Sequence, residues 1–363
     1  MPDDSKPEGA QAPSAAPARE TILTIAGLRK TFGRFTALNG IDLKVAQGEF
    51  LTIVGPSGSG KTTLIRILAG MEEPTEGAIL LRNKRIEKVP ANQRPTCMVF
   101  QSLALFPHRS VGENIEFPLK IQGANRTSRK ARALELMELL RLPAEYYTKG
   151  IHECSGGERQ RIALARALAF DPEILFFDEP LSALDYRLRK TLEKELKDLH
   201  SRTGKTFVYI THSLEEAMVM SDRIAIMRAG HFEQIGTPND IYTRPRSRFV
   251  AEFMGEVNLF PLTPGHGSAL RLAPGAVDAM ADGLLMARPE VLRFLSAGQS
   301  APVEIDGMLE AEYNLGGRLQ YAVNTGLGPV SVEVLRDRRP AASIGAQVRL
   351  GADPADCHLI SDA

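Results

Sequence analysis

The chain has 363 residues, long enough for two domains, and its shares of hydrophobic residues (43%) and charged residues (24%) are ordinary for a globular protein. The formal net charge is zero, so no global basic field favours a nucleic-acid partner. Three widely spaced cysteines, Cys97, Cys154 and Cys357, indicate neither a disulfide framework nor a metal cage, and they fit a reducing cytosol.

Residues 1–20 are rich in alanine, proline and acidic groups, and they lack the basic start and apolar stretch of a secretory signal. We expect a disordered tail there. No run of about 18 apolar residues occurs in the sequence, so we do not expect the chain to span a bilayer by itself. Any role at a membrane then comes through a partner.

Residues 21–254 alternate short apolar segments with helical stretches, which predicts an α/β layer fold with a mainly parallel sheet. The segments 21–26 and 41–46 have no helix between them, so we expect an antiparallel flap. Buried strands are predicted at 51–54, 174–177 and 206–210. A helix is predicted over 126–141, whose basic side chains fit either a solvated face or a surface for a partner.

A glycine-rich loop follows the strand at 51–54 and precedes a helix predicted over 61–69. It fits the pattern G-x-x-x-x-G-K-S/T with the residues Gly55, Pro56, Ser57, Gly58, Ser59, Gly60, Lys61 and Thr62. Backbone N–H groups of such a loop, together with the helix N-terminus, surround the phosphates of ATP. We expect Lys61 to reach the β- and γ-phosphates, Thr62 to ligate Mg²⁺ and Thr63 to add a phosphate contact.

Two adjacent acids, Asp178 and Glu179, follow the four apolar residues at 174–177. Asp178 is expected to hold Mg²⁺ directly or through water, and Glu179 to act as the general base that polarises the attacking water. The alternative, an acid pair at a helix N-terminus, is disfavoured by the phosphate loop, because a bound nucleotide needs such acids.

Two further polar residues follow predicted strands. His212 comes after the strand at 206–210 and before a helix predicted over 213–220, where its imidazole would contact the γ-phosphate. Gln101 comes after a strand predicted at 97–100. Taken alone, the histidine fits a structural role and the glutamine fits a surface amide, so both depend on the rest of the pattern.

After Asn258 glycine and proline become frequent, lysine is absent, and short alternating segments such as 317–323 and 330–334 appear. This pattern predicts a small β-rich domain. The same region contains more acids than bases, which opposes binding to a nucleic-acid backbone.

The stretch from Cys154 to Arg161, C-S-G-G-E-R-Q-R, resembles the signature motif of ATP-binding cassette ATPases. The phosphate loop, Gln101, the signature, the acid pair, the segment 182–185 and His212 follow one another in that family's order. The resemblance implies a P-loop NTPase cassette at 21–255, with a mainly parallel sheet, an antiparallel β flap and a helical subdomain. A small all-β, OB-like domain at 256–363, with a regulatory or dimerising role, would follow it.

The resemblance also implies individual roles. Phe32 matches the aromatic residue that stacks on adenine, a contact that needs only a π-face. Gln101 matches the glutamine that senses Mg²⁺ and the attacking water and links the cassette to the membrane subunit. Asp185 matches the aspartate that couples the two sites of a dimer, and His212 matches the switch histidine.

Ser155, Gly156 and Gly157 match the motif that clamps the γ-phosphate held by the opposite subunit, so the family's two ATP sites form only in a head-to-tail homodimer. Two neighbours depart from the family pattern: Cys154 stands where leucine is common, and Glu158 where glutamine is common. The charge of Glu158 would tune dimer closure. The Cys154 thiol is either activated by the helix N-terminus or buried and inert.

The run at 99–108, V-F-Q-S-L-A-L-F-P-H, resembles importers for polyamines, ferric iron, sulfate and sugars. The segment 249–260 is similar to their junction, and A-R-P-E at 287–290 is similar to a motif of their C-terminal domain. These features imply a peripheral subunit at the cytoplasmic face of the inner membrane, with permease subunits and an external substrate-binding protein as partners. A polyamine such as spermidine or putrescine is the first choice, while ferric iron, sulfate and organophosphonate stay open.

Two other functions compete with transport. A cassette ATPase acting on nucleic acid or ribosomes usually has a long coiled coil or two cassettes, and this chain has one cassette and no long heptad run. A regulatory nucleotide binder without turnover is opposed by the intact Glu179 and His212.

Overall fold

The computed structural model describes residues 19–262, 270–273 and 283–361. The tail expected at 1–20 therefore lies outside the described residues, apart from Arg19 and Glu20. These two residues are attached to the fold: Arg19 donates a 3.0 Å hydrogen bond to Asp222, and the Glu20 carbonyl accepts one of 2.7 Å from the Gln47 N–H. Among the described residues, no helix has both the length and the apolar composition needed to cross a membrane.

The first strands form an antiparallel flap, as expected. It consists of β1 (Thr21–Phe32), β2 (Phe35–Ala46), β4 (Glu76–Leu81) and β5 (Lys84–Arg85), in the order β2-β1-β4-β5. β1 and β2 extend well beyond the segments 21–26 and 41–46, because their pairing continues through mixed polar and apolar residues up to the turn at 33–34. The flap is therefore larger than the two predicted segments.

A second sheet lies at the centre of the N-terminal part, with its strands in the order β10-β9-β3-β8-β7-β6. They are β3 (Phe50–Val54), β6 (Thr96–Val99), β7 (Ile174–Asp178), β8 (Thr206–Ile210), β9 (Arg223–Arg228) and β10 (His231–Gly236). All run parallel except β10, which pairs antiparallel with β9. Ile174 and Phe176 face one core and Leu175 and Phe177 the other, so the apolar strand is buried on both faces.

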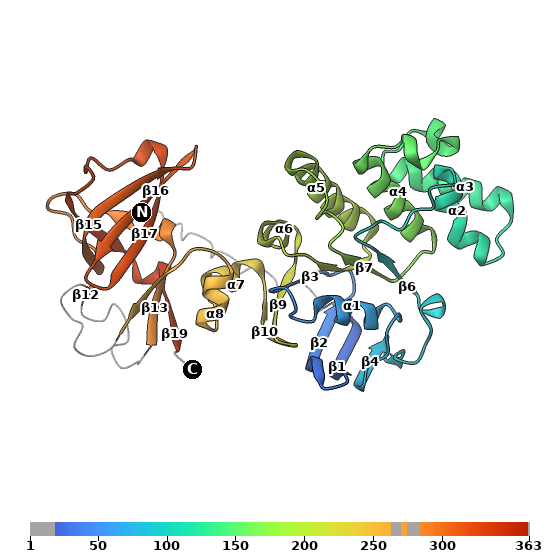
Figure 1. Ribbon diagram of the computed structural model, residues 1–363, viewed down its shortest axis with the longest axis horizontal. Coiled ribbons are helices and arrows are strands. Elements are labelled where there is room, and N and C mark those ends of the chain that lie inside the picture. Colours follow the sequence, from blue (N-terminus) through green and yellow to red (C-terminus); the bar gives the residue numbers. More distant parts are fainter. Residues whose placement is uncertain (1–18, 263–269, 274–282, 362–363) are drawn as a thin grey trace, which may run out of the picture.

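Helices cover both faces of that sheet (Figure 1). They are α1 (Lys61–Leu68), α2 (Val111–Ile121), α3 (Arg126–Leu139), α4 (Gly156–Ala169), α5 (Tyr186–Thr203), α6 (Leu214–Met220), α7 (Pro238–Thr243) and α8 (Arg248–Phe253). α1 shares a core with the flap, whereas α2, α3, α4 and α5 share a core with the opposite face. The helix predicted over 126–141 is α3, which buries Ala133 and Leu136. The α/β layer fold is confirmed.

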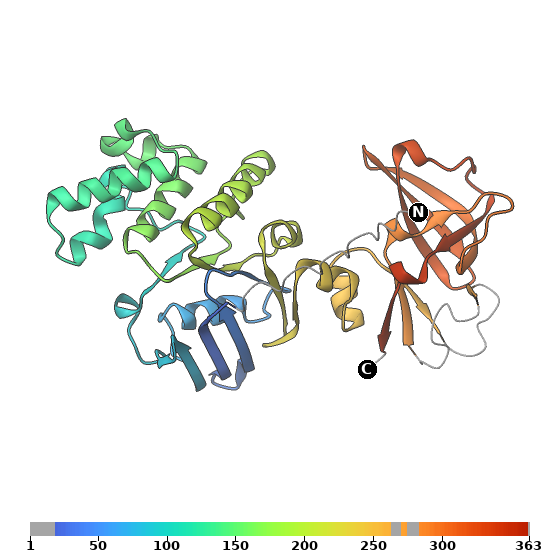
Figure 2. The ribbon, with the colours of Figure 1, turned by 180° about the vertical axis from the view of Figure 1, so that it is seen from behind.

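From Asn258 onward the described chain consists mainly of antiparallel strands, as predicted for a β-rich domain (Figure 2). They are β11 (Asn258–Pro261), β12 (Leu270–Leu272), β13 (Gly283–Ala287), β14 (Arg293–Phe294), β15 (Val303–Asn314), β16 (Arg318–Thr325), β17 (Gly328–Leu335), β18 (Gln347–Ala352) and β19 (His358–Ser361). One sheet has the order β11-β13-β19 and the other β14-β18-β15-β16-β17, with β12 beside β15. The domain limits at 20/21 and 255/256 stay predictions.

Arg288 connects this β-rich part to the helices before it. Its side chain is buried and donates hydrogen bonds to the carbonyls of Tyr242 (3.1 Å), Ala251 (3.0 Å) and Glu256 (3.1 Å). The guanidinium also lies over the Tyr242 ring, 4.2 Å from its centroid. Because Tyr242 belongs to α7 and Ala251 to α8, an arginine of the second part binds carbonyls of helices in the first part.

Candidate functional site

The parallel strands of the central sheet bring their following loops to one edge. The register pairs Ile53 of β3 with Ile210 of β8, Ile210 with Asp178 of β7, and Phe177 of β7 with Val99 of β6. The carboxyl ends of parallel strands meet at the same edge of a sheet, which is where such folds bind ligands. The phosphate loop, the histidine, the acid pair and the glutamine therefore lie on neighbouring strand ends.

The loop between β3 and α1 packs too tightly for side chains at two positions. A Cβ on Gly55 would lie 2.1 Å from the Met227 carbonyl oxygen, and a Cβ on Gly60 would lie 2.6 Å from that of Ala37. Gly60, the N-cap of α1, also has a φ of +105°, which favours glycine. This turn leads directly into α1, whose first N–H groups have no partner within the helix and suit an anion.

Lys61 places a buried positive charge over this loop. Its Nζ donates hydrogen bonds to the carbonyls of Gly55 (2.8 Å) and Pro56 (3.0 Å). Burial lowers the pKa of the Lys61 ammonium, and the carboxylates of Glu179 and Asp178 oppose that effect. The lysine and both acids therefore act on one another electrostatically, as a shared phosphate site requires.

The acid pair stands in an unfavourable environment. Burial raises the pKa of Asp178, and the neighbouring Glu179 carboxylate raises it further, while Arg66 and Lys61 lower it. Glu179 has a φ of +45°, in the left-handed region that disfavours a residue with a side chain. Its N–H group is held by a 3.0 Å hydrogen bond to the Ile210 carbonyl. Backbone strain of this kind concentrates at functional sites, where the surrounding fold maintains it.

A chain of hydrogen bonds joins the remaining predicted residues of this edge. Gln101 donates from Nε2 to the Ser182 hydroxyl at 3.0 Å, and that hydroxyl donates to the Glu179 carbonyl at 2.9 Å. His212 Nδ1 lies 3.2 Å from Glu179 Oε2. The structure thus brings Gln101, Glu179 and His212 together, with Ser182 between two of them.

The residues expected to hold Mg²⁺ fit that ion. Thr62, Gln101 and Asp178 all offer oxygen atoms, which Mg²⁺ prefers. A cation beside Asp178 would offset the repulsion from Glu179 that raises its pKa. Among the residues that the structure describes, no group of three or more His, Cys, Asp or Glu could hold a metal by itself.

The predicted signature stands at the N-terminus of α4. Ser155 is the N-cap: its hydroxyl accepts from the Glu158 N–H at 3.3 Å, and the Glu158 carboxylate accepts from the Ser155 N–H at 2.7 Å. A Cβ on Gly157 would lie 3.0 Å from the Leu188 side chain, so α4 packs closely on α5. Both views show α4 with α2 and α3, apart from α1, so one chain does not bring the signature to its own phosphate loop (Figures 1 and 2).

The two departures from the family signature have structural explanations. Glu158 completes the capping box, and the hydrogen bond from the Ser155 backbone N–H lowers its pKa. Its charge is therefore engaged within its own helix terminus. Cys154 is buried, and burial raises the pKa of its thiol. This environment favours the inert thiol over the activated one.

Phe32 and Asp185 occupy separate places. Phe32 ends β1 with 47% of its surface exposed, and the Lys30 ammonium lies 4.8 Å from its ring centroid. The Lys30 ammonium thus lies beside the Phe32 ring, and the exposed part of the ring is open to a planar ligand at the flap. Asp185 is the N-cap of α5 and accepts a 3.1 Å hydrogen bond from the Leu188 N–H.

One buried acid behind this edge has no counterpart in the sequence-based prediction. Glu216 of α6 accepts hydrogen bonds from the hydroxyls of Tyr209 (2.9 Å) and Thr211 (2.7 Å), and its other oxygen lies 4.0 Å from Arg189 Nε. Arg189 in turn donates to the Leu184 carbonyl at 2.9 Å. Because Thr211 precedes His212, Glu216 links the histidine loop to the segment 182–185. In sequence, Ser-x-x-Glu at 213–216 is typical of a capping box, but in the structure the Ser213 N–H donates to the Thr211 hydroxyl and the Glu216 carboxylate turns to Tyr209 and Thr211.

Comparison with known families supports this architecture. Residues 38–182 match the ABC transporter family, and residues 285–360 match the TOBE domain family. The chain is 51% identical over 234 residues to the spermidine/putrescine import ATP-binding protein PotA of Roseobacter denitrificans, and the alignment spans 64% of either protein. It is 36% identical over 348 residues to the PotA protein of Bacteroides thetaiotaomicron, an alignment that spans 94% of this chain and 74% of that relative.

A solved structure resembles the N-terminal part. The dimeric ATP-binding cassette in a post-hydrolysis state, bound to ADP and Pi, is 31% identical in sequence. It superimposes with a TM-score of 0.53, and the match covers 60% of this chain and 99% of that chain.

Proposed function

The chain belongs to the ABC transporter family, and we propose that it is the ATP-hydrolysing subunit of an importer for polyamines such as spermidine or putrescine. The observation that carries this proposal is the cluster at one sheet edge, where Lys61 and the phosphate loop stand beside Asp178, Glu179 and His212. The R. denitrificans and B. thetaiotaomicron relatives supply the substrate class, because both carry spermidine and putrescine in their names.

In this proposal each side chain has a limited task. ATP supplies the γ-phosphoryl group, and Thr62, Gln101 and Asp178 would hold a Mg²⁺ ion whose charge would offset that of the phosphates. Lys61 binds the phosphate oxygens through its ammonium. Glu179 accepts a proton from the attacking water, whose nucleophilicity rises as that proton is drawn away.

His212 completes the arrangement. Its Nδ1 faces the Glu179 carboxylate at 3.2 Å, which orients the ring and leaves Nε2 for the γ-phosphate. The side chain of His212 is 60% exposed, so the ring is open to a ligand or to a second subunit. We assign Gln101 to the connection between this edge and a permease, because it follows β6 and bonds to Ser182.

We further propose a head-to-tail homodimer as the active form. The signature lies on α4, away from the phosphate loop of its own chain, so Ser155, Gly156 and Gly157 are free to meet the γ-phosphate of a partner. A dimeric cassette among the solved relatives supports this assembly. Permease subunits and a substrate-binding protein complete the importer, and they hold this chain at the cytoplasmic face of the inner membrane.

The test is the variant Glu179→Gln, with Glu138→Gln on the exposed part of α3 as the matched control. Glu179→Gln keeps the shape but loses the base, so ATP hydrolysis should fall about 10²- to 10⁴-fold while ATP binding persists. The Mg-ATP form should then elute as a dimer in size-exclusion chromatography. Hydrolysis at the rate of the control variant would refute the assignment of the site.

The substrate is tested separately by uptake. Cells that lack this chain should regain uptake of radiolabelled putrescine or spermidine with the native chain and with Glu138→Gln, but not with Glu179→Gln. Restored uptake of labelled sulfate or ferric iron in place of the polyamines would leave the ATPase assignment intact and overturn the substrate.

A further inference from the structure

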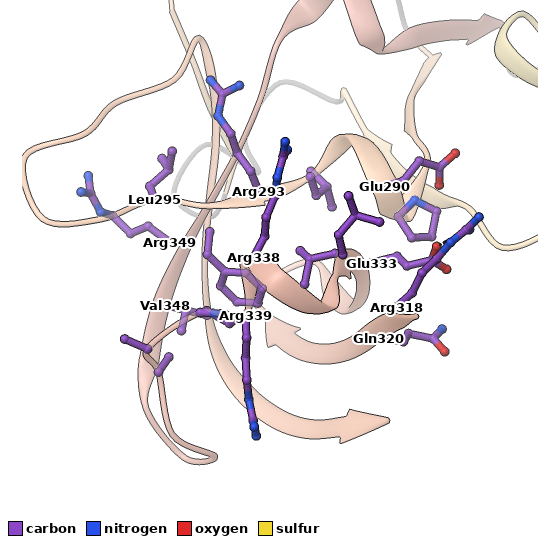
Figure 3. A pocket seen from close by; sticks show the side chains of 18 of the residues that line it. Glu290, Arg293, Leu295, Arg318, Gln320, Glu333, Arg338, Arg339, Val348 and Arg349 are labelled. Atoms are coloured by element: carbon purple, nitrogen blue, oxygen red, sulfur yellow. Dashed lines mark hydrogen bonds and ion pairs between the residues drawn. The ribbon is translucent and has the colours of Figure 1, made fainter. Parts of the chain in front are cut away.

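A large groove lies in the C-terminal β-rich part, apart from the phosphate loop. Its volume is about 1440 Å³, and its walls come from β14, β16, β17, β18 and the segment 338–342 (Figure 3). Tyr242 of α7 and Glu256 of the junction line the side toward the cassette. Pockets for small molecules commonly measure about 300–1,000 Å³, so this groove has room for an organic molecule with its hydration water.

Most arginines of this acidic domain line the groove. Residues 258–363 contain twelve Asp and Glu, eight Arg and no Lys. Five of the eight arginines line the groove: Arg293, Arg318, Arg338, Arg339 and Arg349. Only two of the twelve acids do so, Glu290 and Glu333. A random scatter of charges would place more acids than arginines on this surface, so the enrichment in arginine indicates an anionic ligand.

The acids of the groove already have partners. Glu333 accepts a 2.6 Å hydrogen bond from Arg318, and Glu290 accepts one of 2.7 Å from the Tyr242 hydroxyl. Glu256 accepts hydrogen bonds from two neighbouring side chains. Three acids, Glu256, Glu290 and Glu333, thus face five arginines in the lining, so part of the arginine charge is uncompensated within the groove.

Two of the arginines lack such partners. The guanidinium groups of Arg293 and Arg338 form no hydrogen bond or ion pair with any residue that the structure describes, although the backbone of Arg293 pairs with β18. Figure 3 shows both guanidinium groups extending in the same direction, with Arg349 on one side and Arg318 on the other. Unpaired guanidinium groups that project together suit a ligand with more than one negative group, because each can donate two parallel hydrogen bonds to an oxyanion.

We propose that this groove binds a small organic polyanion. Its phosphate or carboxylate groups pair with Arg293 and Arg338, and its body lies against apolar lining residues such as Leu295 and Val348. The site is separate from the nucleotide site and contributes nothing to hydrolysis directly. Its occupant contacts the β-rich part and, at Tyr242, the last helices of the cassette.

Titration calorimetry on the full chain tests the proposal, with pyrophosphate and citrate as probes. Mg-ADP at saturating concentration occupies the nucleotide site during the titration. At least one probe should bind, and the double variant Arg293→Gln/Arg338→Gln should weaken that binding by about tenfold or more, since charge-assisted hydrogen bonds are lost. The matched control is Arg336→Gln, an exposed arginine of the same segment that does not line the groove.

Two further measurements keep the result interpretable. Probe binding should persist in Lys61→Ala, and loss there would assign the anion to the phosphate loop and overturn the proposal. Thermal midpoints of the double variant and of Arg336→Gln should agree with that of the native chain, which excludes unfolding. Three results would each contradict the proposed site. Neither probe binds the native chain, Arg336→Gln weakens binding as much as the double variant does, or the double variant changes its oligomeric state while it binds the probe like the native chain.

Discussion

At the scale of single residues, burial decides which chemistry the predicted groups can perform. Lys61 is 7% exposed, and burial lowers the pKa of its ammonium, yet two carbonyls and two nearby carboxylates retain the positive charge. Asp178 experiences the opposite shift, since burial and Glu179 raise its pKa. The site thus holds like and unlike charges that a phosphate and a cation would balance together.

Lys61→Ala should therefore abolish ATP turnover and weaken nucleotide binding. Loss of a charged donor at the phosphates costs about 10²-fold or more in rate. Lys84→Ala, on the exposed strand β5, is the matched control and should turn over ATP like the native chain. A phosphate-release assay over a range of ATP concentrations checks both variants. Near-native turnover in Lys61→Ala would refute the assignment of the nucleotide to this loop.

The Cys154 thiol should resist maleimide near pH 7. Burial raises its pKa, so the neutral thiol predominates over the reactive thiolate, and only 4% of the residue is exposed. The variant Cys97→Ala/Cys357→Ala isolates its signal, and mass spectrometry after a timed reaction measures it. Urea-unfolded chain is the positive control. Rapid labelling that inactivates the folded protein and is prevented by ATP would instead show an accessible thiol at the signature.

At the scale of elements, α5 and α6 connect two segments that lie far apart in the sequence, 182–185 and the loop that contains His212. Arg189 of α5 bonds to Leu184 and faces Glu216 of α6, which holds Thr211 beside the predicted switch histidine. Arg189 Nε is buried without a hydrogen-bond partner in the described structure, so its charge depends on the Glu216 carboxylate. These contacts physically connect the segment 182–185 to the histidine loop.

Glu216→Ala should lower kcat about 10- to 100-fold with little change in the KM for ATP, because it displaces the histidine loop and leaves the phosphate loop intact. Glu216→Gln should recover part of the rate, since its amide oxygen still accepts one hydroxyl hydrogen bond. The control is Glu215→Ala, an exposed neighbour on the same helix. Equal kcat in Glu216→Ala and Glu215→Ala would contradict a positioning role, and thermal midpoints separate positioning from unfolding.

At the scale of the whole molecule, the two parts share a buried junction. Arg288 binds carbonyls of Tyr242 and Ala251, and Ala251 also packs in a cluster with Leu284, Met286 and Ile360. A chain cut near Glu256 loses both interactions. Reduced stability of such a truncated chain would therefore reflect the exposed junction as well as any lost contact between subunits.

Arg288→Leu isolates the junction within the full chain. It leaves the buried carbonyls unpaired and should lower the free energy of unfolding by about 2–4 kcal/mol, while the basal ATPase rate at low temperature stays near native. Thermal denaturation followed by circular dichroism measures the effect, with Arg336→Leu as the exposed control. A midpoint equal to that of the control would show that the guanidinium contributes nothing to the junction.

The sequence by itself determined the features that neighbouring residues create. The phosphate loop, the strand ends at Asp178 and Thr211, and the flap all follow from local spacing, because backbone geometry over a few residues depends on those residues. Because the strands are parallel, their carboxyl ends then meet at one edge of the sheet. The tertiary structure alone decided which distant charges meet. The Glu216 carboxylate accepts a hydrogen bond from Tyr209 of β8, outside its own helix, and five arginines from separate strands and turns share one groove. Sheet order and register set these contacts, and neither is contained in the spacing of residues along the chain.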